Sequence, residues 1–309
     1  DDLANRLIGL DGDDTVFAEA GDDTIEGGSG NDEIAGGPGV DSLQLSGSDL
    51  EYHVAFYQDG TVKVEHKVTG GDGTDHLTGV EKIEFANGFW EMGVFDGIMS
   101  LSEGEIRSLV ELYVAMFGRA PDATGLCFWG DVMANGMTLD EIAGHFFDQD
   151  EFRALYPDLS DSGALVDAIY QNVLNRAADT EGKVFWTRVI EEGALGPEKL
   201  VLAVLEGARA AAPDGTAPDF VAQKAADVAY LQGLVDLGVL FSAIKGLNDV
   251  DAAGTVMDTF DGGQPSLDAA LDLIEAAYDA AIDPETGSFL VSLVGVIDDP
   301  FATGDIGMG

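Results

Sequence analysis

An aliphatic residue recurs at every ninth position between residues 9 and 44. Four nonapeptides follow one another there without a gap, each with glycine at its fourth place, aspartate at its sixth and an aliphatic residue at its eighth. A turn of six residues followed by a three-residue strand accounts for this period, with the aliphatic side chain pointing inward. Two nonapeptides would complete one coil. We therefore expect two stacks of aliphatic side chains, one in each of two sheets: Val16 on Ile34, and Ile25 on Leu43.

Alternating apolar residues predict further β structure as far as residue 90. Residues 50–68 alternate on either side of Asp59-Gly60, which is typical of a β-hairpin, and residues 80–90 indicate another strand that ends in an aromatic pair. We expect these strands to cap the coil rather than to form a ligand-binding face, because a thin solenoid needs its open end covered. A detached nonapeptide, GGDGTDHLT at residues 70–78, is out of register with the first four, and this predicts a separate turn.

From about residue 100 the apolar period changes from two to 3.6, which predicts helices. A repeat of 57 residues appears there, made of a helix, a tight Asp-x-x-Gly loop and a Phe-Trp helix closed by glycine. Beyond a linker at residues 211–222, two more helices are expected over residues 228–247 and 267–281. The repeat pairs Tyr113 with Tyr170, Arg119 with Arg176, Asp122 with Asp179, Gly125 with Gly182, Phe128 with Phe185, Trp129 with Trp186 and Gly136 with Gly193.

The polar residues of this helical repeat have two interpretations. Arg119, Asp122 and Trp129, with their counterparts, would line a pocket for a glycan or a protein, or they would support the fold. In the second case the aspartates cap helices, the tryptophans pack in the core and each arginine pairs or stacks locally. We favour the second interpretation, because a pattern that serves two copies is more often a requirement of the fold.

The net charge of the chain excludes some classes of binding partner. Of 309 residues, 14 are Lys or Arg and 58 are Asp or Glu, for a formal net charge of −44, while 46% are hydrophobic. Such a surface repels nucleic acids and anionic membranes and attracts cations. The one cysteine, Cys127, excludes a disulfide framework and a thiolate zinc cluster. We expect no membrane span, because no apolar run reaches about 18 residues, and we expect the chain to be a piece of a longer or processed protein.

The acidic residues are densest in the nonapeptides. Between Arg6 and Lys63 the sequence has thirteen acidic residues and no Lys or Arg. A core one side chain wide cannot offset the repulsion of carboxylates stacked beside it. Oxygen-ligated hard cations would remove that repulsion, and carboxylates with turn carbonyls suit Ca²⁺ better than Mg²⁺. A glycine-rich acidic linker is the alternative, but a linker would not keep three columns of residues in register.

The nonapeptides resemble the RTX, or hemolysin-type, calcium-binding repeat GGxGxDxUx. The resemblance implies a parallel β-roll with Ca²⁺ held between turns two repeats apart. Asp14 and Asp32 would then share one ion, Asp23 and Asp41 another, and Asn5 with Asp23 a weaker third. Leu10, Ala18 and Ala20 depart from the pattern but leave the carboxylates in place. Further ligands implied are the carbonyls of Asp11, Asp13, Asp22, Gly30 and Asn31, and Asp75 takes the sixth place of the detached copy.

The helical half resembles a second family. The motif GRAPDATGLCFW is similar to a helical domain of unknown function that is found in secreted RTX chains and in bacterial S-layer proteins. The resemblance covers roughly residues 100–210. The acidic C-terminal region, with its glycine-rich end at residues 304–309, resembles the export signals of type I secretion.

Together these patterns predict an α+β multidomain protein. A short parallel β-roll with a β-hairpin cap would occupy residues 1–98, and an all-α region would follow. That region would comprise a helical domain of two 57-residue repeats at residues 99–212 and an acidic helical region at residues 213–309.

We expect no enzyme activity. None of the four histidines lies in an HExxH motif, no GxSxG or GxxxxGK[ST] motif occurs, and Cys127 has no histidine at a fixed spacing. His66 and His76 are expected at solvated positions. The function predicted is that of a secreted or cell-surface bacterial structural or adhesive protein whose roll folds on Ca²⁺ outside the cell. The alternative is the C-terminal accessory and export region of a larger secreted RTX enzyme. Surface polysaccharide or another surface protein would be the partner.

Overall fold

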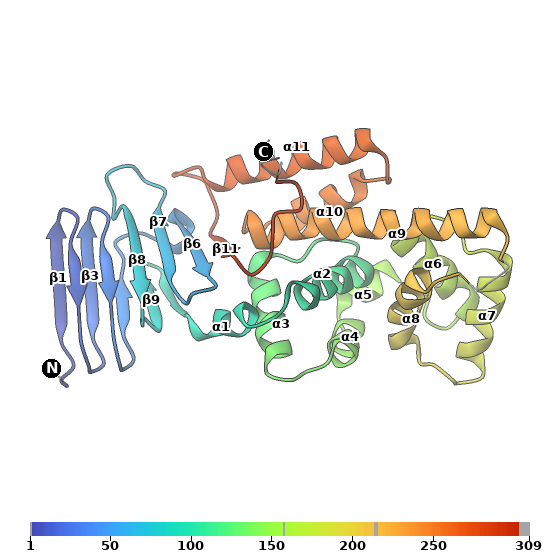
Figure 1. Cartoon of the computed structure of the whole chain (residues 1–309), viewed down its shortest axis with the longest axis horizontal. Helices are drawn as coiled ribbons and strands as arrows, with labels where there is room; N and C mark the ends of the chain where they lie inside the picture. Colours follow the sequence, from blue (N-terminus) through green and yellow to red (C-terminus); the bar gives the residue numbers. More distant parts are fainter. Residues whose placement is uncertain (1, 157, 213–215, 303–309) are drawn as a thin grey trace, which may run out of the picture.

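A computed structural model describes residues 2–156, 158–212 and 216–302. The molecule is elongated, with β-sheets at the N-terminal end and helices at the other (Figure 1). This order agrees with the predicted α+β class. The glycine-rich end at residues 304–309 lies outside the described residues.

The strands form two sheets that share one narrow core. One sheet has the order β1-β3-β5-β9-β10, and the other has the order β11-β6-β7-β8-β4-β2. The first sheet consists of β1 (Arg6–Asp11), β3 (Thr24–Ser29), β5 (Ser42–Gln44), β9 (Lys82–Phe85) and β10 (Gly88–Glu91). The second consists of β2 (Thr15–Phe17), β4 (Glu33–Ala35), β6 (Tyr52–Tyr57), β7 (Val62–His66), β8 (Thr74–Thr78) and β11 (Leu290–Val294).

The nonapeptide strands pair in parallel at a spacing of two repeats. Val16 lies opposite Ile34 in one sheet, and Ile25 lies opposite Leu43 in the other. Ile25 and Leu43 are completely buried, and Val16 and Ile34 are buried as well. The two predicted stacks of aliphatic side chains are therefore confirmed.

The detached nonapeptide continues this stack. Its strand β8 pairs in parallel with β4, which puts Leu77 opposite Ile34. The expectation of a separate turn was wrong. Stacked aliphatic residues are usually 18 residues apart in this coil, and Ile34 and Leu77 are 43 residues apart, but they pair in the same register. The extra residues form the hairpin of β6 and β7, and β7 pairs antiparallel with β8.

The predicted hairpin caps the C-terminal end of the coil. Tyr52 is completely buried, and its ring stacks on that of His66 at 4.4 Å. Of the aromatic pair on β10, Trp90 packs against Phe289 at 4.2 Å, whereas Phe89 is 58% exposed. Since β7 extends the sheet of the coil, the hairpin covers the end of the core, as expected of a cap.

One strand was not predicted. β11, near the C-terminal end of the described chain, pairs in parallel with β6, and Leu290 and Val291 are completely buried. The ring of His53 on β6 lies 2.9 Å from the Ser292 hydroxyl. The expectation of helices alone after residue 98 missed β11, because its partner lies more than 200 residues earlier in the chain.

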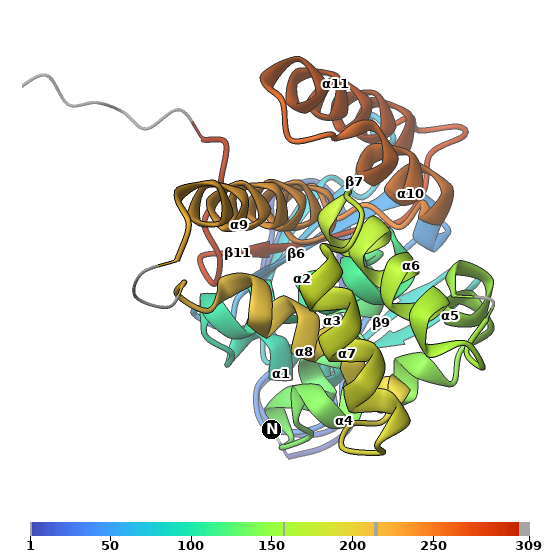
Figure 2. The same ribbon diagram turned by 90° about the vertical axis from the view of Figure 1, so that its right-hand side faces the viewer.

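Helices make up the rest of the described chain. Helix α9 lies between α10 and α11 on one side and the bundle of earlier helices on the other (Figure 2). Two helices were expected after the linker at residues 211–222, but the structure has three. Helix α9 begins inside that linker at Pro218, α10 follows the N-cap Asp249 and was not predicted, and α11 follows the N-cap Gly263. The helices are α1 (Gly93–Met99), α2 (Glu103–Phe117), α3 (Ala123–Ala134), α4 (Leu139–Phe147), α5 (Asp150–Leu155), α6 (Ser162–Leu174), α7 (Thr180–Glu191), α8 (Pro197–Arg209), α9 (Pro218–Val239), α10 (Val250–Thr259) and α11 (Gln264–Ala281), with the 3₁₀ turn η1 (Asp49–Glu51) and the π-helical turn η2 (Leu240–Ile244).

One of these helices is apolar and long. In the described part of the chain, Pro218–Ile244 is long and apolar enough to cross a membrane, although no such run was expected from the sequence. Of its most apolar window, 61% is buried inside the protein. This burial is what a core helix requires, since α9 contacts α2, α6, α8, α10 and α11.

Candidate metal centre

The aspartates at the sixth place of the repeats form a ladder between coils. The backbone N–H of Asp14 donates to Oδ1 of Asp32 at 2.9 Å, and that of Asp23 donates to Oδ1 of Asp41 at 2.8 Å. Each carboxylate thus uses one oxygen to hold the preceding coil at an 18-residue spacing. Three more bonds extend the ladder: Asn5 to Asp23 at 2.7 Å, Asp32 to Asp75 at 3.1 Å and Asp41 to Glu81 at 2.8 Å.

The second oxygen of each repeat carboxylate has no such partner. The Oδ2 atoms of Asp14, Asp23, Asp32 and Asp41 are buried and form no hydrogen bond within the described structure. A buried, unpaired polar atom costs about 1–3 kcal/mol, and more when it carries charge. These four atoms are therefore the places where the bare fold is least satisfied.

Glycine at the first place of the repeat makes room for this oxygen. A Cβ atom on Gly27 would lie 2.3 Å from Oδ2 of Asp32, and one on Gly36 would lie 2.6 Å from Oδ2 of Asp41. In the three nonapeptides that begin with glycine, the aspartate therefore folds back under the start of its own repeat, whereas the second nonapeptide has Ala18 at this place. The turn also needs glycine at its fourth place, where Gly30 has φ of +139°.

Stacking the carboxylates perturbs their acidity. Burial, with the repulsion of Asp14 and other acidic neighbours, raises the pKa of Asp32, and burial with repulsion from Asp23 raises that of Asp41. Burial and the charges of Asp32 and Asp72 raise the pKa of Asp75 to about 7. Both effects disfavour the charged form, and a bound cation would relieve both.

The residues expected to supply carbonyl ligands use their side chains to join coils. Oδ1 of Asp13 accepts the backbone N–H of Asn31 at 2.8 Å, and Oδ1 of Asp22 accepts that of Val40 at 3.0 Å. Oδ1 of Asp11 accepts the Ser29 hydroxyl at 2.9 Å. That the backbone oxygens of these residues bind calcium stays a prediction.

The remaining predicted ligands lie in the same turns. The side-chain oxygen of Asn31 accepts the N–H of Thr74 at 3.0 Å, and Gly30 bridges to Gly73 in the detached nonapeptide. The amide of Asn5 donates to the carbonyl of Leu3 at 2.6 Å. All eleven predicted ligand residues therefore lie in the coil: nine in the four repeats, Asn5 just before them and Asp75 in the detached copy.

The donor set fits a hard divalent cation. Across the described residues, no three or more His, Cys, Asp or Glu side chains converge in a way that would hold a metal. An ion bound here would then be held by pairs of aspartates together with backbone oxygens. Oxygen ligands in that combination are what Ca²⁺ takes, and the four unpaired Oδ2 atoms are the groups it would satisfy.

Two residues of this region were not predicted. Glu81 ends one ladder with a longer side chain, and because it lies outside any nonapeptide the sequence carried no signal for it. Asp72 stands at the third place of the detached copy, as Asp11 does in the first. It accepts the backbone N–H of Ser46 at 2.9 Å and the Tyr52 hydroxyl at 2.5 Å, so it ties the coil to the cap.

The polar residues of the helical repeat support the fold. Asp122 and Asp179 are the N-caps of α3 and α7, each accepting a backbone N–H three residues on at 2.7 Å. Arg119 lies over the ring of Tyr113 at 5.5 Å, and Arg176 lies over that of Tyr170 at 5.2 Å. These contacts agree with the interpretation that we favoured.

The two arginines differ in their ion pairs. Arg119 holds Glu151 at 2.5 and 3.2 Å, whereas Arg176 holds Asp227 of α9 at 2.8 and 2.7 Å. The repeated arginines therefore tie the helices together through partners that do not repeat.

The remaining chemically reactive side chains are engaged or buried. Nδ1 of His66 accepts the backbone N–H of Asp72 at 2.8 Å, and its side chain is 4% exposed, so the expected solvated position was wrong. His76 is 48% exposed, as expected. Cys127 is fully buried, which raises the pKa of its thiol and leaves it unreactive.

This geometry is that of a calcium-binding repeat. The chain carries four copies of the RTX calcium-binding nonapeptide repeat over residues 3–43, so its cofactor is Ca²⁺. Residues 143–212 match a domain of unknown function, DUF4214. Both are the families that the sequence resembles, but the second match begins at residue 143 rather than near residue 100 and does not include the motif at residues 118–129. RTX repeats are typical of secreted bacterial proteins. No curated protein matches the chain.

Proposed function

We propose that this chain is a structural or adhesive protein of the bacterial exterior whose repeat segment, residues 3–44, is a β-roll that folds when Ca²⁺ binds outside the cell. The observation that carries the proposal is the set of four buried Oδ2 atoms that have no hydrogen-bond partner. Within the described residues no hydrogen bond compensates them, whereas the Oδ1 atoms of Asp23, Asp32 and Asp41 already accept backbone N–H groups from neighbouring coils.

The aspartates at the sixth place of the repeats are the residues that would hold the ions. Asp14 and Asp32 would hold one, and Asp23 and Asp41 another, with the detached nonapeptide adding Asp75 beside Asp32. Each Ca²⁺ supplies two positive charges to a segment rich in carboxylates. The residues of the chain contribute the rest: Oδ1 sets the spacing between coils, and in three of the four repeats a first-place glycine leaves room for Oδ2.

The affinity of such sites would make folding depend on the compartment. Extracellular calcium modules bind at about 10⁻⁴–10⁻³ M. The cytosol would leave the repeat segment without Ca²⁺, and the exterior would load it. Binding to the folded form alone stabilises it by about 2.7 kcal/mol per site at a hundredfold excess over Kd.

The helical half should respond differently to the removal of calcium. Ile106, Leu109 and Leu112 of α2 are completely buried together with Phe146 and Phe152. Apolar burial of this kind stabilises at about 25 cal/mol per Å² without any metal. We therefore infer that the helices stay folded when calcium is withdrawn.

Circular dichroism of the full chain tests the proposal. Chelation should remove the β signal and leave most of the helical signal, and Ca²⁺ should restore the β signal cooperatively. Mg²⁺ at the same concentration should not, because it demands a tighter octahedral site. A β signal that is equally strong in chelator would contradict folding on calcium.

We also infer that the chain has a binding rather than a catalytic role. The thiol of Cys127 is buried and protonated, and Nδ1 of His66 is occupied by a backbone N–H. Assays of the purified chain for protease, esterase and glycosidase activity would test this inference, and turnover abolished by a point substitution would overturn it.

A further inference from the structure

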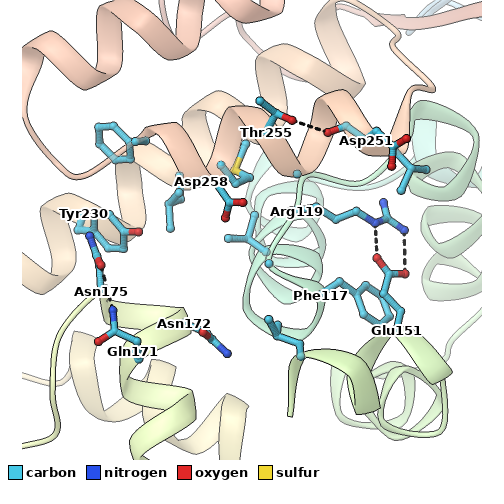
Figure 3. A pocket seen from close by; sticks show the side chains of 18 residues that line it. Phe117, Arg119, Glu151, Gln171, Asn172, Asn175, Tyr230, Asp251, Thr255 and Asp258 are labelled. Carbon is cyan, nitrogen blue, oxygen red and sulfur yellow. Dashed lines mark hydrogen bonds and ion pairs between the residues drawn. The ribbon is translucent and has the colours of Figure 1, made fainter. Parts of the chain in front are cut away.

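The helical half contains a groove far from the nonapeptides. It has a volume of about 640 Å³, within the range of roughly 300–1,000 Å³ of small-molecule sites. Its walls come from the end of α2, from α5, α6, α9 and α10, so segments more than a hundred residues apart face each other across it (Figure 3).

The charged side chains of one wall already form ion pairs. The guanidinium of Arg119 holds both oxygens of Glu151, at 2.5 and 3.2 Å, and lies 5.7 Å from the centre of the Phe117 ring. Arg119 also lies 3.5 Å from Asp122. Its positive charge is therefore committed to carboxylates and does not form a receptor for an anion.

The opposite walls present polar groups with unused bonding capacity. Gln171 and Asn175 of the α6 end share one hydrogen bond of 3.2 Å, which leaves each amide with further donors or acceptors. Asp251 and Asp258 of α10 are exposed, and within the described residues neither carboxylate forms an ion pair. Asp258 points into the centre of the groove in Figure 3.

An aromatic surface completes the groove. The ring of Tyr230 stacks on that of Phe260, with centroids 5.5 Å apart and planes inclined by 3°. Burial and the nearby charges of Asp258 and Asp261 raise the pKa of Tyr230, so its hydroxyl stays a neutral donor. The stacking on Phe260 holds this ring in one orientation at the edge of the groove.

We propose that this groove binds a neutral saccharide chain. Sugar hydroxyls both donate and accept hydrogen bonds, as do the amides of Gln171 and Asn175. Neighbouring hydroxyls would donate to the carboxylates of Asp258 and Asp251, and the less polar face of a sugar ring would lie against Tyr230.

The charge of the groove decides against other ligand classes. With Arg119 neutralised by Glu151, the uncompensated groups are Asp251 and Asp258, so an acidic glycan, a phosphate or a nucleic acid would be repelled. An apolar ligand would leave the amides and both carboxylates without partners. An amine would satisfy the carboxylates but would not use the amide pair, and it serves as the competing ligand in the test.

The groove goes beyond the calcium function and shares no residue with the nonapeptides. Its test uses the full chain in millimolar calcium, with isothermal titration of maltotriose, cellotriose and chitotriose. Putrescine and trigalacturonate are the cationic and acidic comparisons. We expect at least one neutral trisaccharide to bind, more tightly than either comparison.

Two groove variants and two matched controls locate the site. Gln171→Ala and Asp258→Ala should each raise the Kd about tenfold or more, the effect of losing one hydrogen bond to a charged or amide partner. The controls are Gln264→Ala and Asp268→Ala on α11, whose side chains form an i,i+4 pair at 2.7 Å away from the groove, and they should leave Kd unchanged. All four positions are at or near the surface, and a far-ultraviolet spectrum checks that each variant is folded.

Three results would overturn the proposal: no heat of binding from any neutral trisaccharide, tighter binding of putrescine, or saccharide binding that the groove variants leave unchanged. Each of these would leave the calcium titration of the same sample unaffected. A failure here is therefore distinguishable from a failure of the calcium proposal.

Discussion

Replacing Asp32 by asparagine separates the two tasks of its carboxylate. The side-chain oxygen of asparagine can still accept the backbone N–H of Asp14, now at 2.9 Å, so the link between coils survives. The charge is lost, and an NH₂ group takes the place of the buried Oδ2 atom, which at present lacks a partner. An amide nitrogen cannot bind Ca²⁺. We therefore expect a variant that keeps its hydrogen bond but loses its metal.

The position of Asp32 sets the size of the effect. It lies between Asp14 and Asp75 in one column, so the substitution affects a site on either side. A site at a hundredfold excess over Kd contributes about 2.7 kcal/mol, and a tenfold loss of affinity removes about 1.4 kcal/mol of that. In saturating calcium the repeat segment should lose about 3–5 kcal/mol. In chelator the change should be under about 1 kcal/mol, because relief of repulsion from Asp14 offsets the buried NH₂ group.

Hydrogen exchange read by mass spectrometry measures this locally. Peptides that span β3 to β5 should lose protection in calcium in the variant, while peptides from α2 and α3 serve as an internal reference. The matched control is Asp59→Asn in the hairpin turn, whose carboxylate accepts a hydrogen bond from Thr61 at the surface. It removes the same charge and should change neither region. If Asp32→Asn lowers protection equally with and without calcium, Asp32 is a hydrogen-bonding residue only and the metal assignment fails.

Two further predictions concern the helical half and the junction with the sheets. Gly125→Ala should lower the free energy of unfolding by about 1–3 kcal/mol in thermal melts, because its Cβ would lie 2.8 Å from the Tyr113 hydroxyl; Gly144→Ala, with nothing within 4 Å, should be neutral or stabilising. Burial lowers the pKa of His53 from 6.5 to about 4. Between these two pH values the imidazole is therefore protonated in the unfolded chain but neutral in the folded chain. The free energy of unfolding should thus fall by up to about 3 kcal/mol as the pH drops from 6.5 to 4. Urea titrations at the two pH values measure this loss, and His53→Gln should lack the part that comes from His53.

The short-range structure of this protein follows from its local sequence. A nine-residue period in which glycine, aspartate and an aliphatic residue recur places Val16 on Ile34 and Ile25 on Leu43. The reason is geometric, since identical consecutive turns can stack in only one register. Helix starts were equally local, because an aspartate such as Asp122 caps the N–H groups of its own first turn.

Which distant segments meet depends on how the whole chain packs. No period reveals that β8 continues the stack after a 43-residue separation, or that β11 pairs with β6. Parallel pairing uses backbone N–H and C=O groups, which every residue type except proline carries in full. The partner of a strand therefore depends on which pairing lets the whole chain bury its apolar side chains. Arg119 and Arg176 show the same limit: identical in the repeat, they bind Glu151 in one copy and an α9 aspartate in the other. The groove, too, exists only because α9 and α10 return across the helices that precede them.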